Sequence, residues 1–357
     1  MTKRSLRIAM IAPPWFDVPP PAYGGIEQMV ADLVDGLVQR GHEVTLIGAG
    51  RNGTRARFLS TYQEAPGDRL GEPVPEVLHA ARAARLLRGL DVDVVHDHCL
   101  AGPLTSAGRD VPTLVTVHGP VNGELGEYYA ELGDQVGLVA ISDAQRGFAP
   151  RLNWVGTVHN AIRVDDFPFR TTKDDYVLFL GRMCPDKGLH VAIEVIRRAG
   201  MRLVVAAKCR EEPEKAYFEE YVKPLLGPDV EYLGEVTGAA KRELLANARC
   251  LLFPIQWEEP FGLVMIEALA CGTPVVALRR GSVPEIVRHG VTGLVHDHPD
   301  ELVRALSAVE DIDPHACRLD ARRRFDLAVM TTRYEQLYRR VAGPREVDPS
   351  SSTGLAA

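Results

Sequence analysis

Short runs of consecutive apolar residues recur along the chain and are separated by segments with helical periodicity. These runs are rich in Val, Ile and Leu, and most are bounded by Gly, Pro, Asp or His. Continuous apolar runs of this length are typical of parallel strands whose two faces are both covered. We predict strands in two groups, at 7–13, 43–48, 93–96, 113–118, 137–142 and 156–160, and at 176–181, 202–207, 230–234, 250–254, 274–278 and 293–297.

The intervening segments carry apolar residues at the spacing of an amphipathic helix. In residues 26–41, one face collects Ile26, Met29, Val30, Leu33, Val34 and Leu37. Further helices are predicted at 79–90, 188–200, 241–249 and 325–341. Alternation of strands and helices is typical of α/β proteins with parallel sheets. We therefore predict two Rossmann-like, doubly wound parallel sheets.

A polar segment divides this pattern into two halves of similar size. Residues 163–175 contain a proline and no apolar period, and the alternation then starts again. We predict an N-terminal domain over 1–163, a C-terminal domain over 164–324 and a terminal helix over 325–342. The tail 343–357 is rich in Pro, Ser and Gly, and we expect it to be disordered. Ligands of such sheets bind beyond the carboxyl ends of the strands, so two facing domains would form a cleft.

The composition is that of an ordinary globular protein of 357 residues, with 46% hydrophobic and 25% charged residues. The net charge of −7 argues against nucleic acid as the main partner, because a basic footprint is missing. Six cysteines without CxxC spacing indicate free thiols in a reducing compartment. The sequence shows neither a signal peptide nor an apolar window of membrane length, so we expect a cytoplasmic protein.

The stretch 258–278 places two glutamates, Glu259 and Glu267, around the start of an apolar helix. The first N–H groups of a helix have no intrahelical partner, and the helix dipole is positive there. Phe261, Gly262 and Leu263 therefore form a predicted phosphate site, where Gly262 lets the backbone approach closely. The two carboxylates can accept hydrogen bonds from a ribose and from a second sugar. The ligand that fits this pattern is a nucleotide-diphosphate sugar.

Two glycine-containing loops can balance the charge of a diphosphate beside these acids. In residues 181–188, Arg182 can fork onto phosphate oxygens and Lys187 can act as a point charge. In the first half, Gly24 and Gly25 precede a predicted helix and can present backbone N–H groups to phosphate.

These motifs resemble those of retaining glycosyltransferases of the GT-B fold. Within this fold they are similar to the large family that carries the E-x7-E motif, which is like glycosyltransferase family 4. The resemblance covers nearly the whole chain, in the family's order: YGGIE, VVHDH, TVHGP, TVHNAI, FLGRMCPDKG, EYLGEV and EEPFGLVMIEALACGTPVVA. The last run is the most specific. The resemblance implies that the terminal helix packs back on the first domain.

The resemblance also implies roles for individual residues. Glu259 corresponds to the acid that holds hydroxyls of the donor sugar, and Glu267 to the acid that binds the ribose. Arg182 and Lys187 correspond to a diphosphate clamp, and residues 261–263 to backbone contacts with the donor.

Three positions outside these motifs complete the expected site. His118 matches the family's active-site histidine, which contacts the primary hydroxyl of the donor sugar. Residues 234–236, with Val236, fall where the base pocket is expected. Lys208 stands where many members have a glycine-rich turn, and it is a further candidate contact to phosphate or base.

On this interpretation the protein transfers a hexose to an acceptor hydroxyl with retained anomeric configuration and without a metal or other cofactor. The candidate catalytic residues are His118, Arg182, Lys187 and Glu259. No side chain is placed as a nucleophile, and the leaving phosphate oxygen would take the acceptor proton, as proposed for similar enzymes. A sugar-nucleotide epimerase and a non-catalytic nucleotide-sugar-binding protein are the alternatives. The sequence specifies neither the donor sugar nor the acceptor, which can be a sugar, a lipid-linked sugar or a small molecule.

Four other motifs have simpler explanations. The run 48–53 fits GxGxxG, but the segment after it has no apolar helical face. The DVD at 91–93 resembles a metal-binding DxD motif, yet it stands at the entry of a buried strand, where a turn is expected. The HDH runs at 96–98 and 296–298 lack a complete ligand set, even with His118, so we expect no metal site.

Arg82, Arg85 and Arg88 lie at helical spacing on one face of residues 79–90. Family members that act on lipids dock on anionic membranes through such faces, so peripheral contact with the inner face of a membrane is one interpretation. A solvated basic stripe is the simpler alternative.

Overall fold

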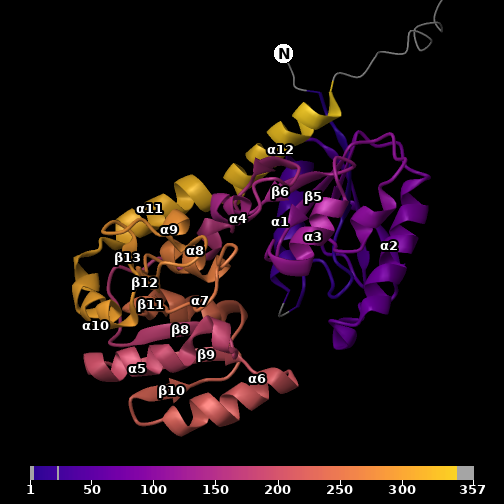
Figure 1. Cartoon of the computed structure of the whole chain (residues 1–357). Helices are drawn as coiled ribbons and strands as arrows, with labels where there is room; N and C mark the ends of the chain where they lie inside the picture. The colour runs from indigo at the N-terminus through magenta and orange to yellow at the C-terminus, as the bar shows by residue number, and fades with distance from the viewer. Residues whose placement is uncertain (1–3, 22–23, 344–357) are drawn as a thin grey trace, which may run out of the picture.

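The chain forms two parallel β-sheets, each flanked by helices, in a computed structural model that describes residues 4–21 and 24–343 (Figure 1). The first sheet has seven strands in the order β3-β2-β1-β4-β5-β6-β7, and the second has six in the order β10-β9-β8-β11-β12-β13. All neighbouring strands are parallel. The predicted α/β fold with two Rossmann-like sheets is therefore confirmed.

The first sheet brings the carboxyl ends of its strands to one edge. Its strands are β1 (Arg7–Ile11), β2 (Glu43–Ala49), β3 (Arg57–Tyr62), β4 (Val94–Asp97), β5 (Thr113–Val117), β6 (Gly137–Ala140) and β7 (Trp154–Thr157). Its helices are α1 (Gly25–Gln39), α2 (Pro73–Leu87), α3 (Gly123–Glu131) and α4 (Asp143–Phe148). The sequence pattern did not predict β3, because this edge strand mixes polar and apolar residues and buries only Thr61.

The second sheet repeats this plan. Its strands are β8 (Val177–Arg182), β9 (Leu203–Lys208), β10 (Val230–Tyr232), β11 (Cys250–Phe253), β12 (Val275–Leu278) and β13 (Gly293–His296). Its helices are α5 (Leu189–Ala199), α6 (Glu212–Tyr217), α7 (Gly238–Asn247), α8 (Leu263–Ala270), α9 (Val283–Ile286), α10 (Pro299–Ala308) and α11 (Pro314–Phe325). A 3₁₀ turn, η4 (Pro185–Lys187), follows β8.

The chain crosses between the two domains twice, and the two crossings are hydrogen-bonded to each other. The N–H of Ile162 donates to the carbonyl of Phe325 at 3.0 Å, and the N–H of Leu327 donates to the carbonyl of Ile162 at 2.9 Å. The two crossings therefore lie side by side.

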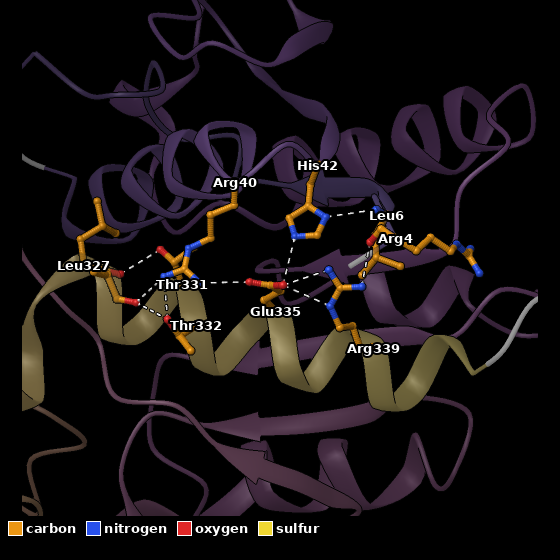
Figure 2. A network of polar contacts seen from close by, with 10 residues as sticks. Arg4, Leu6, Arg40, His42, Leu327, Thr331, Thr332, Glu335 and Arg339 are labelled. Carbon is orange, nitrogen blue, oxygen red and sulfur yellow. Dashed lines mark hydrogen bonds and ion pairs between the residues drawn. The ribbon is translucent and has the colours of Figure 1, made fainter. Parts of the chain in front are cut away.

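After the second crossing, α12 (Leu327–Ala342) packs against α1 of the first domain (Figure 1). Figure 2 shows the polar side of this contact, where Glu335 accepts hydrogen bonds from Arg40 at 3.0 Å and from Arg339 at 2.9 Å. Gly36 permits the close approach, because a Cβ there would lie 2.5 Å from the hydroxyl of Thr331. The tail predicted to be disordered lies outside the described residues from 344 onward.

All six cysteines are unpaired, and four of them are buried. Among the helices in the described part of the chain, none combines the length and apolarity that a membrane crossing requires.

Candidate active site at the facing edges of the two domains

Glu259 and Lys187 form an ion pair at the carboxyl edge of the second sheet. Lys187 ends the turn η4 after β8, and Glu259 lies in the loop between β11 and α8. The Lys187 Nζ atom lies 2.5 Å from Glu259 Oε2, and the Trp257 indole N–H donates to the same oxygen at 3.0 Å. Glu259 is only 7% exposed. A buried charge needs such partners, so the pair fixes the carboxylate that is predicted to hold the donor sugar.

The backbone of the Glu259 loop is held by the segment just before α9. The N–H of Ser282 donates to the carbonyl of Glu259 at 2.9 Å, and the Ser282 hydroxyl donates to the carbonyl of Phe261 at 2.8 Å. Gly281 has φ +52°, and a Cβ there would lie 2.3 Å from the carbonyl oxygen of Glu259. A glycine is therefore required for this loop to pack against its neighbour.

The N-terminus of α8 keeps its first N–H groups without a side-chain cap from the residues that the structure describes. Gly262 is the N-cap with φ +78°, and no side chain in the described part of the chain caps this helix. Glu267 lies one turn further, and its Oε1 atom is 2.6 Å from Nζ of Lys241 in α7. Glu259 and Glu267 are thus each paired with a lysine. The sequence interpretation missed Lys241, because the sequence does not show that α7 packs beside α8.

Arg182 and Lys208 end the neighbouring strands β8 and β9, where they are directly paired in the register. Arg182 is exposed, whereas Lys208 is buried and lies 2.5 Å from Glu211 and 3.5 Å from Glu214. Arg182 is therefore the cation with freedom to move toward a phosphate. Half-buried Val236 follows β10 in the same edge of the sheet.

The start of α1 in the first domain meets the start of α8 in the second. Gly24 is the N-cap of α1 with φ +142°. A Cβ on Gly25 would lie 3.5 Å from the Cδ1 atom of Leu263, so the two helix starts are in van der Waals range. The positive ends of two helices therefore lie close together, an arrangement that favours an anion beside them.

Glu27, in the first turn of α1, is a candidate site residue that the sequence interpretation missed. It is 3% exposed, and burial raises its pKa from 4.5 to about 7. Its Oε2 atom would be 3.2 Å from a Cβ at Gly24. A carboxyl that is partly protonated at neutral pH repels a nearby phosphate less than an ordinary glutamate does.

His118, directly after β5, belongs to a cluster of three histidines. Its Nε2 atom lies 2.9 Å from Nδ1 of His98, whose Nε2 lies 3.1 Å from the sulfur of Met10. His96 bonds Tyr338 and Thr116, both at 2.7 Å. Burial lowers the pKa of His96 and of His118 to about 3 and lowers that of His98 well below its usual value.

The order of these contacts fixes which nitrogen of His118 is free. A thioether has no proton, so the hydrogen between His98 and Met10 belongs to Nε2 of His98. Neutral His98 then accepts at Nδ1, and His118 donates from Nε2. His118 consequently keeps Nδ1 as a hydrogen-bond acceptor, the chemistry needed to receive a sugar hydroxyl.

The DVD run at 91–93 has a structural role at the start of β4. Asp93 accepts hydrogen bonds from Arg4 and from the backbone of Arg7, both at 2.8 Å. In the residues that the structure describes, no group of three or more His, Cys, Asp and Glu side chains is arranged to hold a metal ion. The arginine stripe on α2 is divided: Arg82 donates to the carbonyl of Thr61 at 2.6 Å and stacks on Tyr62, whereas Arg85 and Arg88 are exposed.

The chain has two doubly wound sheets, and a helix start of one domain lies close to a helix start of the other. Acids and cations gather near these helix starts. This combination is that of a glycosyltransferase of the GT-B type. A family profile described as "Glycosyl transferases group 1" matches residues 163–325, and one described as "Glycosyltransferase Family 4" matches residues 23–165. The chain belongs to the family of glycosyltransferases that these two profiles together describe.

Three similar proteins illustrate the relationship. AviGT4, a glycosyltransferase involved in avilamycin A biosynthesis, is 31% identical with a TM-score of 0.72, over 94% of this chain and 98% of that one. A phosphatidyl-myo-inositol mannosyltransferase of Mycolicibacterium smegmatis is 26% identical over 95% of both chains. HepE of Anabaena, solved with UDP-glucose, shares the fold with a TM-score of 0.71 at 16% identity, over 93% of this chain and 98% of that one.

Proposed function

We propose that this glycosyltransferase moves a hexose from a nucleotide-diphosphate sugar to an acceptor hydroxyl, with retention of anomeric configuration and without a metal or other cofactor. The observation that carries the proposal is the Lys187–Glu259 pair beside the uncapped start of α8. This arrangement combines a cation, open amides and a hydroxyl-binding acid within one loop cluster. The UDP-glucose bound by HepE, a protein of the same fold, supports the choice of donor.

The donor diphosphate would lie between the starts of α8 and α1. Backbone N–H groups after Gly262, the point charge of Lys187 and the exposed fork of Arg182 would then surround the phosphate oxygens. Negative charge grows on the leaving phosphate as the glycosidic bond breaks. Preorganised donors directed at that charge lower the barrier because they act more strongly in the transition state than in the ground state.

Three side chains would hold the two sugars of the donor. Glu267 would accept the ribose hydroxyls, Glu259 hydroxyls of the transferred hexose, and Nδ1 of His118 its primary hydroxyl. The bond from the anomeric carbon to the phosphate oxygen breaks, and the acceptor oxygen bonds to the same face of that carbon. The acceptor proton passes to the leaving phosphate oxygen, so no protein nucleophile is needed.

A ligand screen followed by product analysis tests the proposal. Melting curves with UDP-, GDP-, ADP- and dTDP-sugars should show one donor that raises the melting temperature. That donor is then mixed with sugars, lipid-linked sugars and small hydroxylated molecules. Transfer with release of free nucleoside diphosphate supports the proposal, whereas an isomerised donor indicates an epimerase and an unchanged donor indicates a binding protein. The anomeric coupling constant of the product tests retention, and undiminished turnover in EDTA tests metal independence.

A further inference from the structure

Glu285 belongs to the second domain, but its carboxylate is bonded to the first domain. It projects from α9 and accepts hydrogen bonds from the N–H groups of Asp143 at 2.9 and 3.0 Å and of Ala144 at 3.1 Å, at the start of α4. Nε2 of His159, on the first crossing, lies 2.5 Å from the same carboxylate. Burial alone would raise the pKa of Glu285, but these hydrogen bonds outweigh it and lower the pKa.

On the second-domain side, α9 is fixed to the loop that carries Glu259. Ser282, three residues before Glu285, bonds the carbonyls of Glu259 and Phe261. The guanidinium of Arg324, at the end of α11, donates to the backbone carbonyl of Glu285 and to the neighbouring carbonyl of Ile286. The segment around Glu285 is therefore held directly against the loop that carries Glu259.

On the first-domain side, α4 is fixed to the loop that carries His118. The amide of Gln145 donates to the carbonyl of Val117 at 2.8 Å and to that of Gly119 at 2.7 Å, on either side of His118. The same side chain accepts from the N–H of Ile141 at 2.9 Å, and it is 2% exposed. Hydrogen bonds, joined by the short backbone of α4 from Asp143 to Gln145, thus connect the Glu259 loop through Glu285 to the His118 loop.

We propose that Glu285 is a positioning residue that holds the His118 loop of one domain at a defined place relative to the Glu259 loop of the other. This inference rests on the proposed function of those two loops. The base, ribose and diphosphate would be bound by residues of the second domain and the start of α1. Removing the Glu285 contact should therefore leave nucleotide binding intact and impair the step that requires His118.

Kinetics of Glu285→Gln test the inference, because this variant keeps the shape of the side chain and removes its charge. The variant's dissociation constants for UDP, GDP, ADP and dTDP should stay within threefold of wild type, while its turnover should fall tenfold or more. The matched control is Glu335→Gln, which removes a carboxylate that ties α12 to Arg40 without contacting α4 or α9, and its turnover should be unchanged. Parallel loss of nucleotide binding, or a fall in turnover of less than tenfold, would overturn the inference.

A double-variant experiment separates positioning from general weakening of the fold. In the background of His118→Ala, adding Glu285→Gln should reduce turnover by less than twofold, because the positioned group is already absent. A full additional tenfold loss would refute action through His118.

Amide hydrogen exchange provides a readout that needs no activity. Glu285→Gln should speed exchange at the start of α4 and at residues 118–120, and Glu335→Gln should not. Unchanged exchange at 118–120 would refute the inference about Glu285. A wild-type protein that transfers no sugar would refute the proposed function instead, so the two failures can be told apart.

Discussion

The ammonium of Lys187 lies 2.5 Å from a carboxylate oxygen of Glu259, although 72 positions separate the two residues in the chain. The lysine therefore has two tasks in the proposed mechanism: it neutralises a buried acid before the donor arrives, and it meets the diphosphate afterwards. A change at this position should consequently affect both stability and turnover.

Lys187→Ala is expected to lower turnover about a hundredfold or more, in line with the loss of a charge-stabilising group. It should also destabilise the protein by roughly 3 kcal/mol, because Glu259 is left buried without its cation. Steady-state rates and urea unfolding measure the two effects. The control is Lys223→Ala in the same domain, which removes the exposed pair with Glu219 and should change neither quantity noticeably.

Arg182→Ala provides a contrast, because this side chain is exposed at the end of β8. We expect a loss of turnover of about a hundredfold here too, but a melting temperature close to that of wild type. Near-normal turnover in both Arg182→Ala and Lys187→Ala would refute the diphosphate clamp.

Lys241 forms the second lysine–glutamate pair of the site, with Nζ 2.6 Å from Oε1 of Glu267. Lys241→Met keeps the aliphatic length and removes the charge, so Glu267 loses its orientation and repels the diphosphate more strongly. Because this weakens ground-state binding, KM for the donor should rise about fivefold while kcat changes little. A fall in kcat at constant KM would assign Lys241 to the reaction step instead.

His118 is expected to stay neutral over the whole working range of pH. Burial lowers its pKa to about 3, so its imidazole carries no charge above about pH 4. The ratio of wild-type kcat/KM to that of His118→Asn should therefore be constant between pH 5 and 9. If this ratio decreases as the pH is lowered below 6.5, the imidazole titrates near its usual value. An NMR titration of the ring protons would check the protonation state of His118 without an activity assay.

Much of the fold could be predicted because parallel strands that are covered on both faces appear in the sequence as continuous apolar runs. β1 and β12 show this, since four of the five residues of β1 and all four of β12 are buried. β3 could not be predicted in this way, because an edge strand need not be apolar on both faces.

The candidate site could be predicted only where its residues fall within one contiguous motif. Glu259 and Glu267 share such a stretch, and Arg182 and Lys187 share another. Lys241 and Glu285 could not be found, because their importance depends on how separate helices pack. Lys241 reaches the motif from α7, and Glu285 reaches α4 across the domain interface.

Glu27 offers a test of the electrostatics at the start of α1. Burial raises its pKa from 4.5 to about 7, so the folded protein binds this proton more tightly than the unfolded chain does. The resulting stability is fully present below pH 4.5 and is lost as the pH rises through 7. At about 1.4 kcal/mol for each pH unit, the wild type should lose roughly 2–3 kcal/mol from this group between pH 5 and 8.

Glu27→Gln keeps the shape of the side chain but has no proton to lose. The difference in free energy of unfolding between this variant and the wild type, measured in urea, should therefore shift in favour of the variant by roughly 2–3 kcal/mol as the pH rises from 5 to 8. Parallel pH dependences for the two proteins would show that Glu27 titrates normally. If the carboxyl does hold its proton, a diphosphate bound at this helix start should raise its pKa further, and binding at pH 7.5 should take up a fraction of a proton from the buffer. Calorimetry in two buffers of different ionisation enthalpy measures that uptake, and Glu27→Gln should abolish it.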